Sequence, residues 1–355
     1  MKALIAMSGG VDSSVAAKLV REAGYECVGC TMKLFEPEAV SDSCGAASGA
    51  EDARLVAERL DMPFYLLDLQ GEFRRCVIDK FIDSYSRGVT PNPCIDCNKN
   101  LKFGRLLQKA DELGCDHIAT GHYARVRRDP ATGKYLLMKA VDRSKDQSYV
   151  LYNLTQQLLA RVLLPLGDLT KQQVRELAGA DGFVNAEKPE SQDICFVPDG
   201  DYAAVIKNFS GREYPPGDYV DLNGNVIGTH RGIIHYTIGQ HKHLGQAFGE
   251  KRYVCRIDAA TNRIVLGSNE DTFSSDAKTT GVNWISGEVP AGEIRCRVRL
   301  RYKQKEQWAT VRPVIDPDGT DAAEIRFDQP QRAITPGQAA VFYDEDIVLG
   351  GGTLV

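Results

Sequence analysis

The stretch Met7-Ser8-Gly9-Gly10-Val11-Asp12-Ser13-Ser14 decides how this chain folds, because it joins a predicted strand to a predicted helix. Residues 2–7 form a short apolar run of the length of a buried strand, and apolar residues recur at helical spacing over residues 15–23. Adjacent glycines allow close approach of the backbone, and the unpaired N–H groups of a helix's first turn attract anions. A lone Gly-Gly is more often an ordinary capped turn, but the flanking hydroxyl groups and Asp12 favour a loop that binds phosphate.

The order of residues in this loop separates it from other phosphate-binding loops. It contains neither G-x-x-x-x-G-K-[ST] nor G-x-G-x-x-G. Residues 8–13 instead resemble, without a gap, the PP-loop S-G-G-x-D-S of the ATP pyrophosphatases. Those enzymes cleave ATP between the α- and β-phosphates and join AMP to a substrate oxygen. The resemblance implies that the loop holds the departing pyrophosphate and that the chemistry is adenylation.

Length and composition predict a soluble protein of two or three domains, with 355 residues and a net charge of -5. No uninterrupted apolar stretch approaches the length of a membrane span, and the N-terminus does not read as a signal peptide. We therefore expect a cytoplasmic protein that does not bind membranes. In that compartment the ten cysteines suggest thiol chemistry, catalysis or metal binding rather than disulfides.

Predicted strands and helices alternate through the first half of the chain. Strands are expected at residues 25–32, 63–69 and 116–120, helices at 48–60, 73–81 and 98–113, and a polar loop at 41–44. This order predicts a doubly wound parallel sheet, in which ligands bind beyond the carboxyl ends of the strands. Residues 8–13, Met32 and Gly121 all fall there and could share one nucleotide.

Two groups of cysteines call for different interpretations. Residues 91–99 read Pro-Asn-Pro-Cys-Ile-Asp-Cys-Asn-Lys, and a helix is predicted to begin just after Cys97. A thiol at a helix N-terminus with Lys99 close by should have a lowered pKa and be a better nucleophile or metal ligand. Cys27 and Cys30 lie three positions apart on a predicted strand, so they point to opposite faces and are expected to be small buried residues.

Five motifs occur in order along the chain: S-G-G-V-D-S-S, N-P-C-I-D-C-N, G-H-Y-A-R, K-D-Q-S-Y and S-Q-D-I-C-F. Alone, His122 would more often be structural and residues 145–147 a solvated turn. Together the motifs resemble the family of tRNA-specific 2-thiouridylases, and the resemblance continues through residues 236–240 and 335–343. The chain departs from the family at His241-Lys242-His243, where Arg and Gly are usual.

The resemblance implies a role for individual residues. The catalytic residues would be a nucleophilic Cys97, a persulfide-bearing Cys195, and Asp12. The ATP contacts would be Ala6, Met7, Ser8, Gly9, Gly10, Val11, Asp12, Ser13, Met32 and Gly121. The RNA contacts would be Asn92, Pro93, Cys94, His122, Lys145, Asp146, Gln147, Arg301, Tyr302 and Gln338.

The same resemblance implies the cofactors and partners. ATP and Mg²⁺ would serve an adenine nucleotide α-hydrolase-like domain. The substrates would be tRNAs for Lys, Glu and Gln, modified at the wobble uridine. A cysteine desulfurase or a sulfur-relay protein would supply the sulfur, and we expect the enzyme to be a monomer.

From about residue 210 the pattern changes to short strands separated by Gly, Pro and Asn turns, which predicts two small β domains. We expect a catalytic domain at residues 1–208, a central β domain at 209–275 and a C-terminal, barrel-like β domain at 276–355. On one predicted strand, six cations occupy alternate positions: Arg295, Arg297, Arg299, Arg301, Lys303 and Lys305. Six like charges on one face repel each other, which favours a polyanionic partner such as RNA.

Three alternatives stay open. Cys94 stands where many relatives carry Asp, so Cys94, Cys97 and Cys195 could bind an iron–sulfur cluster instead of forming a working pair beside an inert variant. A PP-loop ligase acting on a small molecule would explain residues 8–14 but not the two cysteines. A non-catalytic RNA-binding protein would leave the intact loop unexplained.

Overall fold

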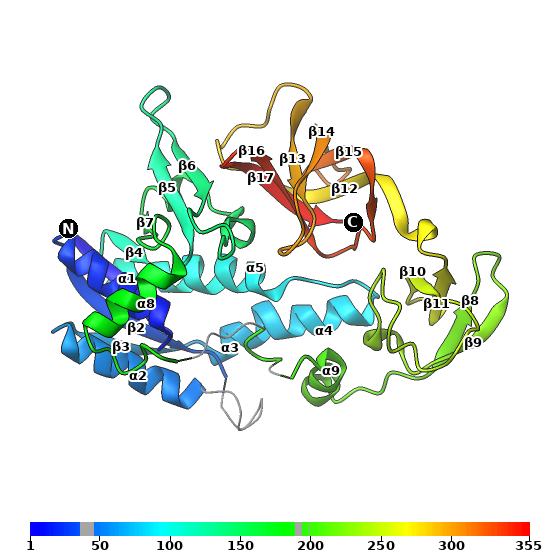
Figure 1. Ribbon diagram of the computed structural model, residues 1–355, viewed down its shortest axis with the longest axis horizontal. Coiled ribbons are helices and arrows are strands. Elements are labelled where there is room, and N and C mark those ends of the chain that lie inside the picture. The colour runs from blue at the N-terminus through cyan, green and yellow to red at the C-terminus, as the bar shows by residue number, and fades with distance from the viewer. Residues whose placement is uncertain (36–45, 189–193, 198) are drawn as a thin grey trace.

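The computed structural model describes residues 1–35, 46–188, 194–197 and 199–355 (Figure 1). The predicted polar loop at 41–44 and residues 191–193 of the fifth motif lie outside the described residues. In the described part of the chain, no helix has the length and apolar character needed to cross a membrane.

A five-stranded parallel sheet in the order β3-β2-β1-β4-β7 forms the N-terminal part of the fold (Figure 1). Its strands are β1 (Lys2–Ala6), β2 (Glu26–Lys33), β3 (Phe64–Asp68), β4 (His117–Ala119) and β7 (Val162–Leu163). One face packs against α1 (Val11–Glu22), α2 (Ala46–Arg59) and α8 (Lys171–Ala180), and the other against α6 (Leu106–Glu112). Helices on both faces confirm the predicted doubly wound sheet. Cys27 and Cys30 are buried in the two different apolar clusters, as expected.

A second group of helices leads from the sheet to the central domain. It consists of α3 (Gln70–Phe73), the π-helix η2 (Arg74–Ile78), α4 (Asp79–Ser86), α5 (Pro93–Cys97), the π-helix η3 (Asn98–Arg105) and α9 (Tyr202–Ser210). Phe73, Phe81, Leu101 and Phe196 share one apolar cluster with Tyr219 and Ile234 of the central domain. The N-terminal and central parts are therefore joined by a continuous apolar core.

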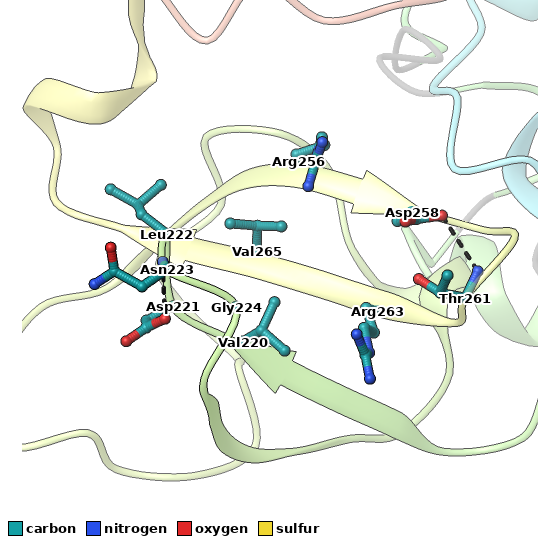
Figure 2. Close-up of a pocket in the computed structure, with 10 residues that line it drawn as sticks. All are labelled: Val220, Asp221, Leu222, Asn223, Gly224, Arg256, Asp258, Thr261, Arg263 and Val265. Atoms are coloured by element: carbon teal, nitrogen blue, oxygen red, sulfur yellow. Dashed lines mark hydrogen bonds between the residues drawn. The ribbon is translucent and has the colours of Figure 1, made fainter.

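The central domain is a four-stranded sheet in the order β10-β11-β8-β9. Its strands are β8 (Gly217–Val220), β9 (Val226–His230), β10 (Tyr253–Asp258) and β11 (Arg263–Gly267), accompanied by the 3₁₀ turns η5 (Ile233–His235) and η6 (Glu270–Thr272). A hollow of about 280 Å³ lies on this sheet, between the turn at residues 221–224 and side chains such as Arg256 and Arg263 (Figure 2). It contains none of the predicted site residues.

The C-terminal domain is a barrel of six strands. They are β12 (Phe273–Trp284), β13 (Ile294–Arg299), β14 (Gln307–Ile315), β15 (Asp321–Arg332), β16 (Ala339–Asp344) and β17 (Ile347–Leu354), and pairing of β12 with β17 closes the ring. A hairpin of β5 (Ala124–Arg128) and β6 (Tyr135–Lys139) joins this sheet through Ile347 and Met138. The short elements η4 (Ser148–Leu151) and α7 (Gln156–Leu159) follow the hairpin. The two predicted β domains are confirmed, but attachment of the hairpin to the barrel was not predicted.

The predicted row of six cations on one strand face is wrong. β13 ends at Arg299, and the chain turns so that Gln307 can pair with Val298, which leaves Arg301, Lys303 and Lys305 in a connecting loop. Arg295 forms an ion pair with Asp328, while Arg301 donates hydrogen bonds to Ala333 O and Thr335 Oγ1. Much of the expected positive charge is therefore engaged within the protein.

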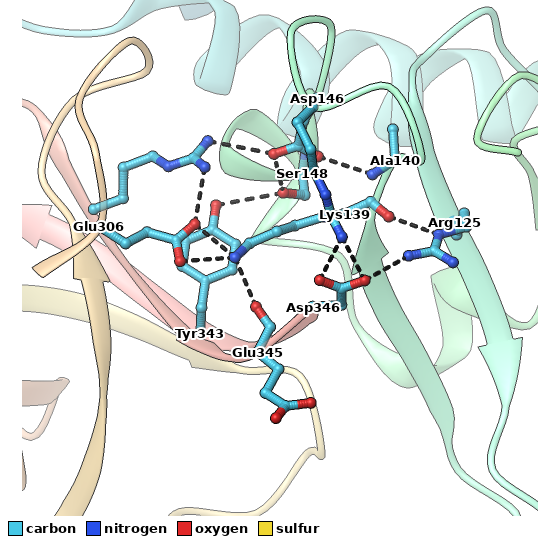
Figure 3. A network of polar contacts seen from close by, with 11 residues as sticks. Arg125, Lys139, Ala140, Asp146, Ser148, Glu306, Tyr343, Glu345 and Asp346 are labelled. Atoms are coloured by element: carbon cyan, nitrogen blue, oxygen red, sulfur yellow. Dashed lines mark hydrogen bonds and ion pairs between the residues drawn. The ribbon is translucent and has the colours of Figure 1, made fainter. Parts of the chain in front are cut away.

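A buried polar network lies between the barrel and the hairpin segment, and Figure 3 labels Lys139, Asp146 and Glu306 within it. Arg299 of β13 also belongs to this network. The Arg299 guanidinium donates to Asp146 at 3.3 Å and to Glu306 at 2.9 Å. The Lys139 ammonium lies 2.6 Å from Glu306 and donates to Glu345 O at 2.6 Å. The side chain of Asp146 is 2% exposed, so its charge depends on these partners.

Arg299→Met should therefore lower the free energy of unfolding by about 3 kcal/mol, because it removes the charged partner of a buried carboxylate. The matched control is Arg297→Met: Arg297 is exposed, and its guanidinium lies 5.1 Å from the centre of the Trp308 ring. That variant should lose no more than about 1 kcal/mol. Urea unfolding measures both, and equal midpoints for the two variants would contradict the importance of the network.

Candidate active site

The glycine-rich loop predicted to bind phosphate, called the phosphate loop below, lies between the end of β1 at Ala6 and the start of α1 at Val11, where the order of the strands reverses. Gly9 has a φ of 74°, and a Cβ there would lie 2.0 Å from Gly49 O of α2, so only glycine fits. Ser13 Oγ accepts from Ser8 N at 3.1 Å and donates to Gly10 O at 2.9 Å. Asn185 Nδ2 donates to Gly9 O and to Ser14 Oγ, each at 2.9 Å. The serine and asparagine side chains thus shape the loop around the N-terminus of α1.

The other two segments predicted to contact ATP lie beside this loop. A Cβ on Gly121 would lie 2.9 Å from Ser13 N and from the carbonyl carbon of Asp12, so its backbone packs against the start of α1. Met32 is near the end of β2, where Thr31 Oγ1 donates to Met7 O at 2.7 Å. The three segments meet at the position where open α/β sheets bind their ligands.

Asp12 has two partners that the sequence did not reveal. Its Oδ1 accepts from the Tyr123 hydroxyl and from Lys171 Nζ, each at 2.7 Å. An unpaired Asp12 carboxylate would repel a phosphate group. The ammonium of Lys171 offsets this negative charge and provides a cation beside a loop that contains none. In the sequence, Thr170 and Gln173 have the spacing of a capping box. This pattern indicates that a helix begins at Lys171, but it does not indicate that Lys171 contacts Asp12.

The cysteine helix begins earlier than expected. Pro93 is its first residue, and Asn92 Oδ1 caps it by accepting from Cys94 N at 3.2 Å. Cys97 therefore lies at the end of the first helical segment rather than at an N-terminus. Burial raises the pKa of the Cys97 thiol and also that of the Cys94 thiol, although Cys94 remains in contact with solvent. The predicted lowering of the Cys97 pKa by the helix N-terminus and Lys99 is wrong.

The segment that carries Cys195 packs into the same apolar cluster as Cys97. Ile194 and Cys97 lie against this cluster, and Phe196 and Val197 belong to it. Cys195 is exposed, and none of the nine described cysteines forms a disulfide. The fold thus directs both cysteines toward one region while leaving their thiols separate.

The residues predicted to contact RNA fall into two groups. Tyr302 and Cys94 both reach solvent. Burial of the rest of the Tyr302 side chain raises its pKa, and the charges of Asp146 and Cys94 raise it further. Gln338 Nε2 donates to Thr90 O at 2.9 Å and to Pro91 O at 3.3 Å, which ties the barrel to the loop before Asn92. These residues surround the start of the cysteine helix.

Members of the second group are engaged with other protein groups. Asp146 is buried in the network around Arg299, and His122 is 7% exposed. Gln147 and Tyr123 exchange two hydrogen bonds, of 2.8 and 2.9 Å, through the Gln147 N–H and side-chain oxygen. Because Tyr123 also contacts Asp12, the segment at residues 145–147 is linked to the phosphate loop.

The described residues offer no cluster for a metal. No three His, Cys, Asp or Glu side chains in this part of the chain are grouped so that they could hold an ion. Cys94, Cys97 and Cys195 are all described, so the geometry does not support the iron–sulfur alternative.

Three family models match the chain along its length. Residues 1–199 match the tRNA methyl transferase HUP domain, residues 204–268 the tRNA methyl transferase PRC-barrel domain and residues 274–354 the aminomethyltransferase beta-barrel domain.

Relatives also match from end to end. A "tRNA-specific 2-thiouridylase MnmA" of Carboxydothermus hydrogenoformans is 50% identical over 99% of this chain and 97% of its own length. The protein of the same name from Clostridioides difficile is 48% identical over 99% of this chain and 98% of its own. That of Acetivibrio thermocellus is 46% identical over 99% of each.

Proposed function

Because the chain belongs to the family of tRNA-specific 2-thiouridylases, we propose that it uses ATP to replace the 2-oxygen of the wobble uridine in tRNA by sulfur. The observation that carries the proposal is the complete PP-loop at the switch point of the sheet, on the domain that also presents Cys97 and Cys195. A small-molecule ligase would not need these cysteines, and a non-catalytic RNA-binding protein would not need the loop. Although the three family models are described by methyl or aminomethyl transfer, the full-length relatives are named for thiolation.

The first step activates a poor leaving group. The uridine 2-oxygen attacks the α-phosphate of ATP, which forms the O-adenylated uridine and releases pyrophosphate. Backbone N–H groups of residues 8–13 and the Lys171 ammonium would stabilise the phosphate charge, and such electrostatic stabilisation is usually the largest catalytic effect. Mg²⁺, when bound with ATP, would neutralise further charge, and Asp12 is the carboxylate available to hold it.

The second step transfers sulfur from a persulfide on Cys195. Its outer sulfur bonds to C2 of the uridine, and AMP leaves with the original oxygen. The Cys97 thiolate then attacks the inner sulfur of Cys195, forming a disulfide and leaving the outer sulfur, with the bonding electron pair, on the uridine. Alternatively, Cys97 attacks first and releases hydrosulfide, which then reacts with the adenylated carbon. Either order ends in a Cys97–Cys195 disulfide that an external thiol must reduce.

Several parts of the proposal come from the resemblance. These are the identity of the tRNAs (Lys, Glu and Gln), a cysteine desulfurase or sulfur-relay protein as the sulfur donor, and the monomeric state. An exposed Cys195 supports delivery by a separate protein. We also retain the domain limits 1–208, 209–275 and 276–355, which lie close to the limits of the family matches. An iron–sulfur cluster is not part of the proposal.

Mass spectrometry of nucleosides from tRNA tests this function. The protein is incubated with unmodified tRNA, ATP and a persulfide-generating cysteine desulfurase, without added iron. We expect 2-thiouridine that depends on ATP, with one AMP formed for each sulfur transferred. AMP formation without thiolated nucleoside would restrict the protein to adenylation, and formation of neither would contradict the proposal.

A further inference from the structure

The helix that carries Cys97 changes its winding immediately after that residue. Cys97 is the N-cap of the π-helix η3. In an α-helix, a residue five positions later would point about 140° away, because each turn takes 3.6 residues. In a π-helix, hydrogen bonds join residues five positions apart, which brings them onto one side of the helix. The π-helical winding therefore brings Lys102 toward Cys97.

His122 holds the end of the Lys102 side chain. Lys102 Nζ lies 3.5 Å from His122 Nε2, and because an ammonium can only donate, Nε2 must be the acceptor. His122 Nδ1 then carries the proton and donates to Thr120 Oγ1 at 2.7 Å. Burial, together with the charge of Lys102, holds the pKa of His122 well below its ordinary value, so the ring stays neutral. His122 is thus a fixed acceptor at the end of β4.

Lys102 is not neutralised by a carboxylate within the residues that the structure describes. In contrast, Lys80 lies 2.5 Å from Asp96, and Lys109 lies 2.9 Å from Glu112. The positive charge of Lys102 is therefore available to groups beside it.

Lys102 differs from the other groups around Cys97 in its effect on the pKa of the thiol. Burial raises the pKa of the thiol most, and the charges of Cys94 and Asp96 raise it further, whereas Lys102 lowers it. Lys99, the cation expected from the sequence, acts on Asp96 instead. The elements near the cysteine helix also carry charged or titratable side chains. These are Arg74 (paired with Asp79), Arg75 and Cys76 on η2, Tyr149 on η4, and Tyr302 in the barrel domain. Among the described residues, Lys102 is the cation whose charge lowers the pKa of both thiols of the helix.

We propose that Lys102 is the residue that favours the reactive thiolate of Cys97, and that His122 positions Lys102 for this role. The proposal rests on the proposed function only in taking Cys97 as the nucleophile. The Cys97 thiol gives its proton to solvent, and the ammonium of Lys102 stabilises the resulting anion until it attacks the inner sulfur of Cys195. This assigns His122 a positioning role in addition to the RNA contact implied by the resemblance.

The test measures the pH dependence of iodoacetamide alkylation at Cys97, followed by peptide mass spectrometry in the full-length protein. Lys102→Gln should raise the alkylation midpoint by about one pH unit, as expected for loss of a nearby opposite charge. The matched control Lys99→Gln removes an exposed lysine of the same helix and should leave the midpoint unchanged. Lys102→Arg should keep most of the original midpoint, and His122→Ala should shift it part of the way.

Alkylation of Cys97 does not require tRNA thiolation. Its pH midpoint therefore tests the role of Lys102 independently of whether the protein thiolates tRNA. An unchanged midpoint in Lys102→Gln, or an equal shift in Lys99→Gln, would overturn the role of Lys102 even if the enzyme thiolates tRNA. ATP binding confirms that each variant is folded. If Lys102→Gln does not fold, Lys102→Arg and His122→Ala keep the test decisive, because a midpoint that is the same in wild type and His122→Ala overturns the positioning role. In the thiolation assay, the deficit of Lys102→Gln should shrink as the pH rises.

Discussion

Cys97→Ser and Cys195→Ser should each reduce tRNA thiolation by at least about 10³-fold, the scale of loss when a reacting group is removed. A serine hydroxyl can neither carry the persulfide nor form the disulfide that releases sulfur onto the uridine. ATP binding should stay nearly unchanged, because the segments that carry Cys97 and Cys195 pack into a different apolar cluster from the one that holds α1. Formation of 2-thiouridine, measured alongside ATP binding, separates the two effects.

Two further variants make this test specific. Cys76→Ser changes a half-buried thiol that packs against the same apolar cluster as Cys97, and it should keep normal activity. Cys94→Ser should retain sulfur transfer at saturating tRNA, because the mechanism uses two thiols and Cys94 is assigned only to RNA contact. Normal thiolation by either the Cys97 or the Cys195 variant would end the two-cysteine mechanism, and complete loss in the Cys94 variant would revive the three-thiol alternative.

Asp12→Ala should slow adenylation itself by at least about 10²-fold, as removal of a charge-stabilising group typically does. The substitution removes the acceptor that holds both Lys171 and Tyr123, so the ammonium is no longer fixed beside the loop. Formation of AMP in the presence of tRNA measures this step directly. Binding of tRNA should change little, which distinguishes the result from a general loss of structure.

Asp181→Ala is the matched control for this prediction. Like Asp12, Asp181 forms an ion pair with a lysine: Lys18 Nζ of α1 lies 2.9 Å from Asp181 Oδ2. Asp181 is the C-cap of α8, at the opposite end of that helix from Lys171, and its replacement should leave AMP formation normal. If Asp12→Ala produced AMP at the normal rate, the assignment of the loop as the ATP site would be wrong.

The sequence predicted those parts of the fold that depend on local pattern. Residues 8–13 and the alternation of strands with helices sufficed to predict the sheet and the place of the glycine-rich loop at its switch point. β7 has two residues and leaves no periodic signal. Lys171 could not be predicted as a partner of Asp12, because 159 positions separate them and the contact depends on how α8 packs.

Two predictions were wrong for physical reasons: the row of six cations on one strand and the lowered pKa of Cys97. Alternating cations share a face only while the strand continues, and the acids that pair with them come from other parts of the chain, such as Asp328 and Asp146. For Cys97, the signal of an Asn cap followed by Pro at the first helical position was present in Asn92 and Pro93. Because the helix begins at Pro93, Cys97 lies at the end of α5, and the cation that lowers the pKa of its thiol is Lys102 and not the predicted Lys99.

The buried network of Arg299 and Lys139 also constrains how the chain matures on the ribosome. Asp146 is synthesised 153 residues before Arg299, and Lys139 is synthesised 167 residues before Glu306. Until the barrel emerges, both early charges must remain hydrated, because burying an unpaired charge is strongly unfavourable. The segment at residues 145–147, which is linked to the phosphate loop, therefore reaches its final arrangement late in synthesis. A nascent chain could thus complete its parallel sheet and still lack an ordered junction between the hairpin segment and the barrel until translation is nearly finished.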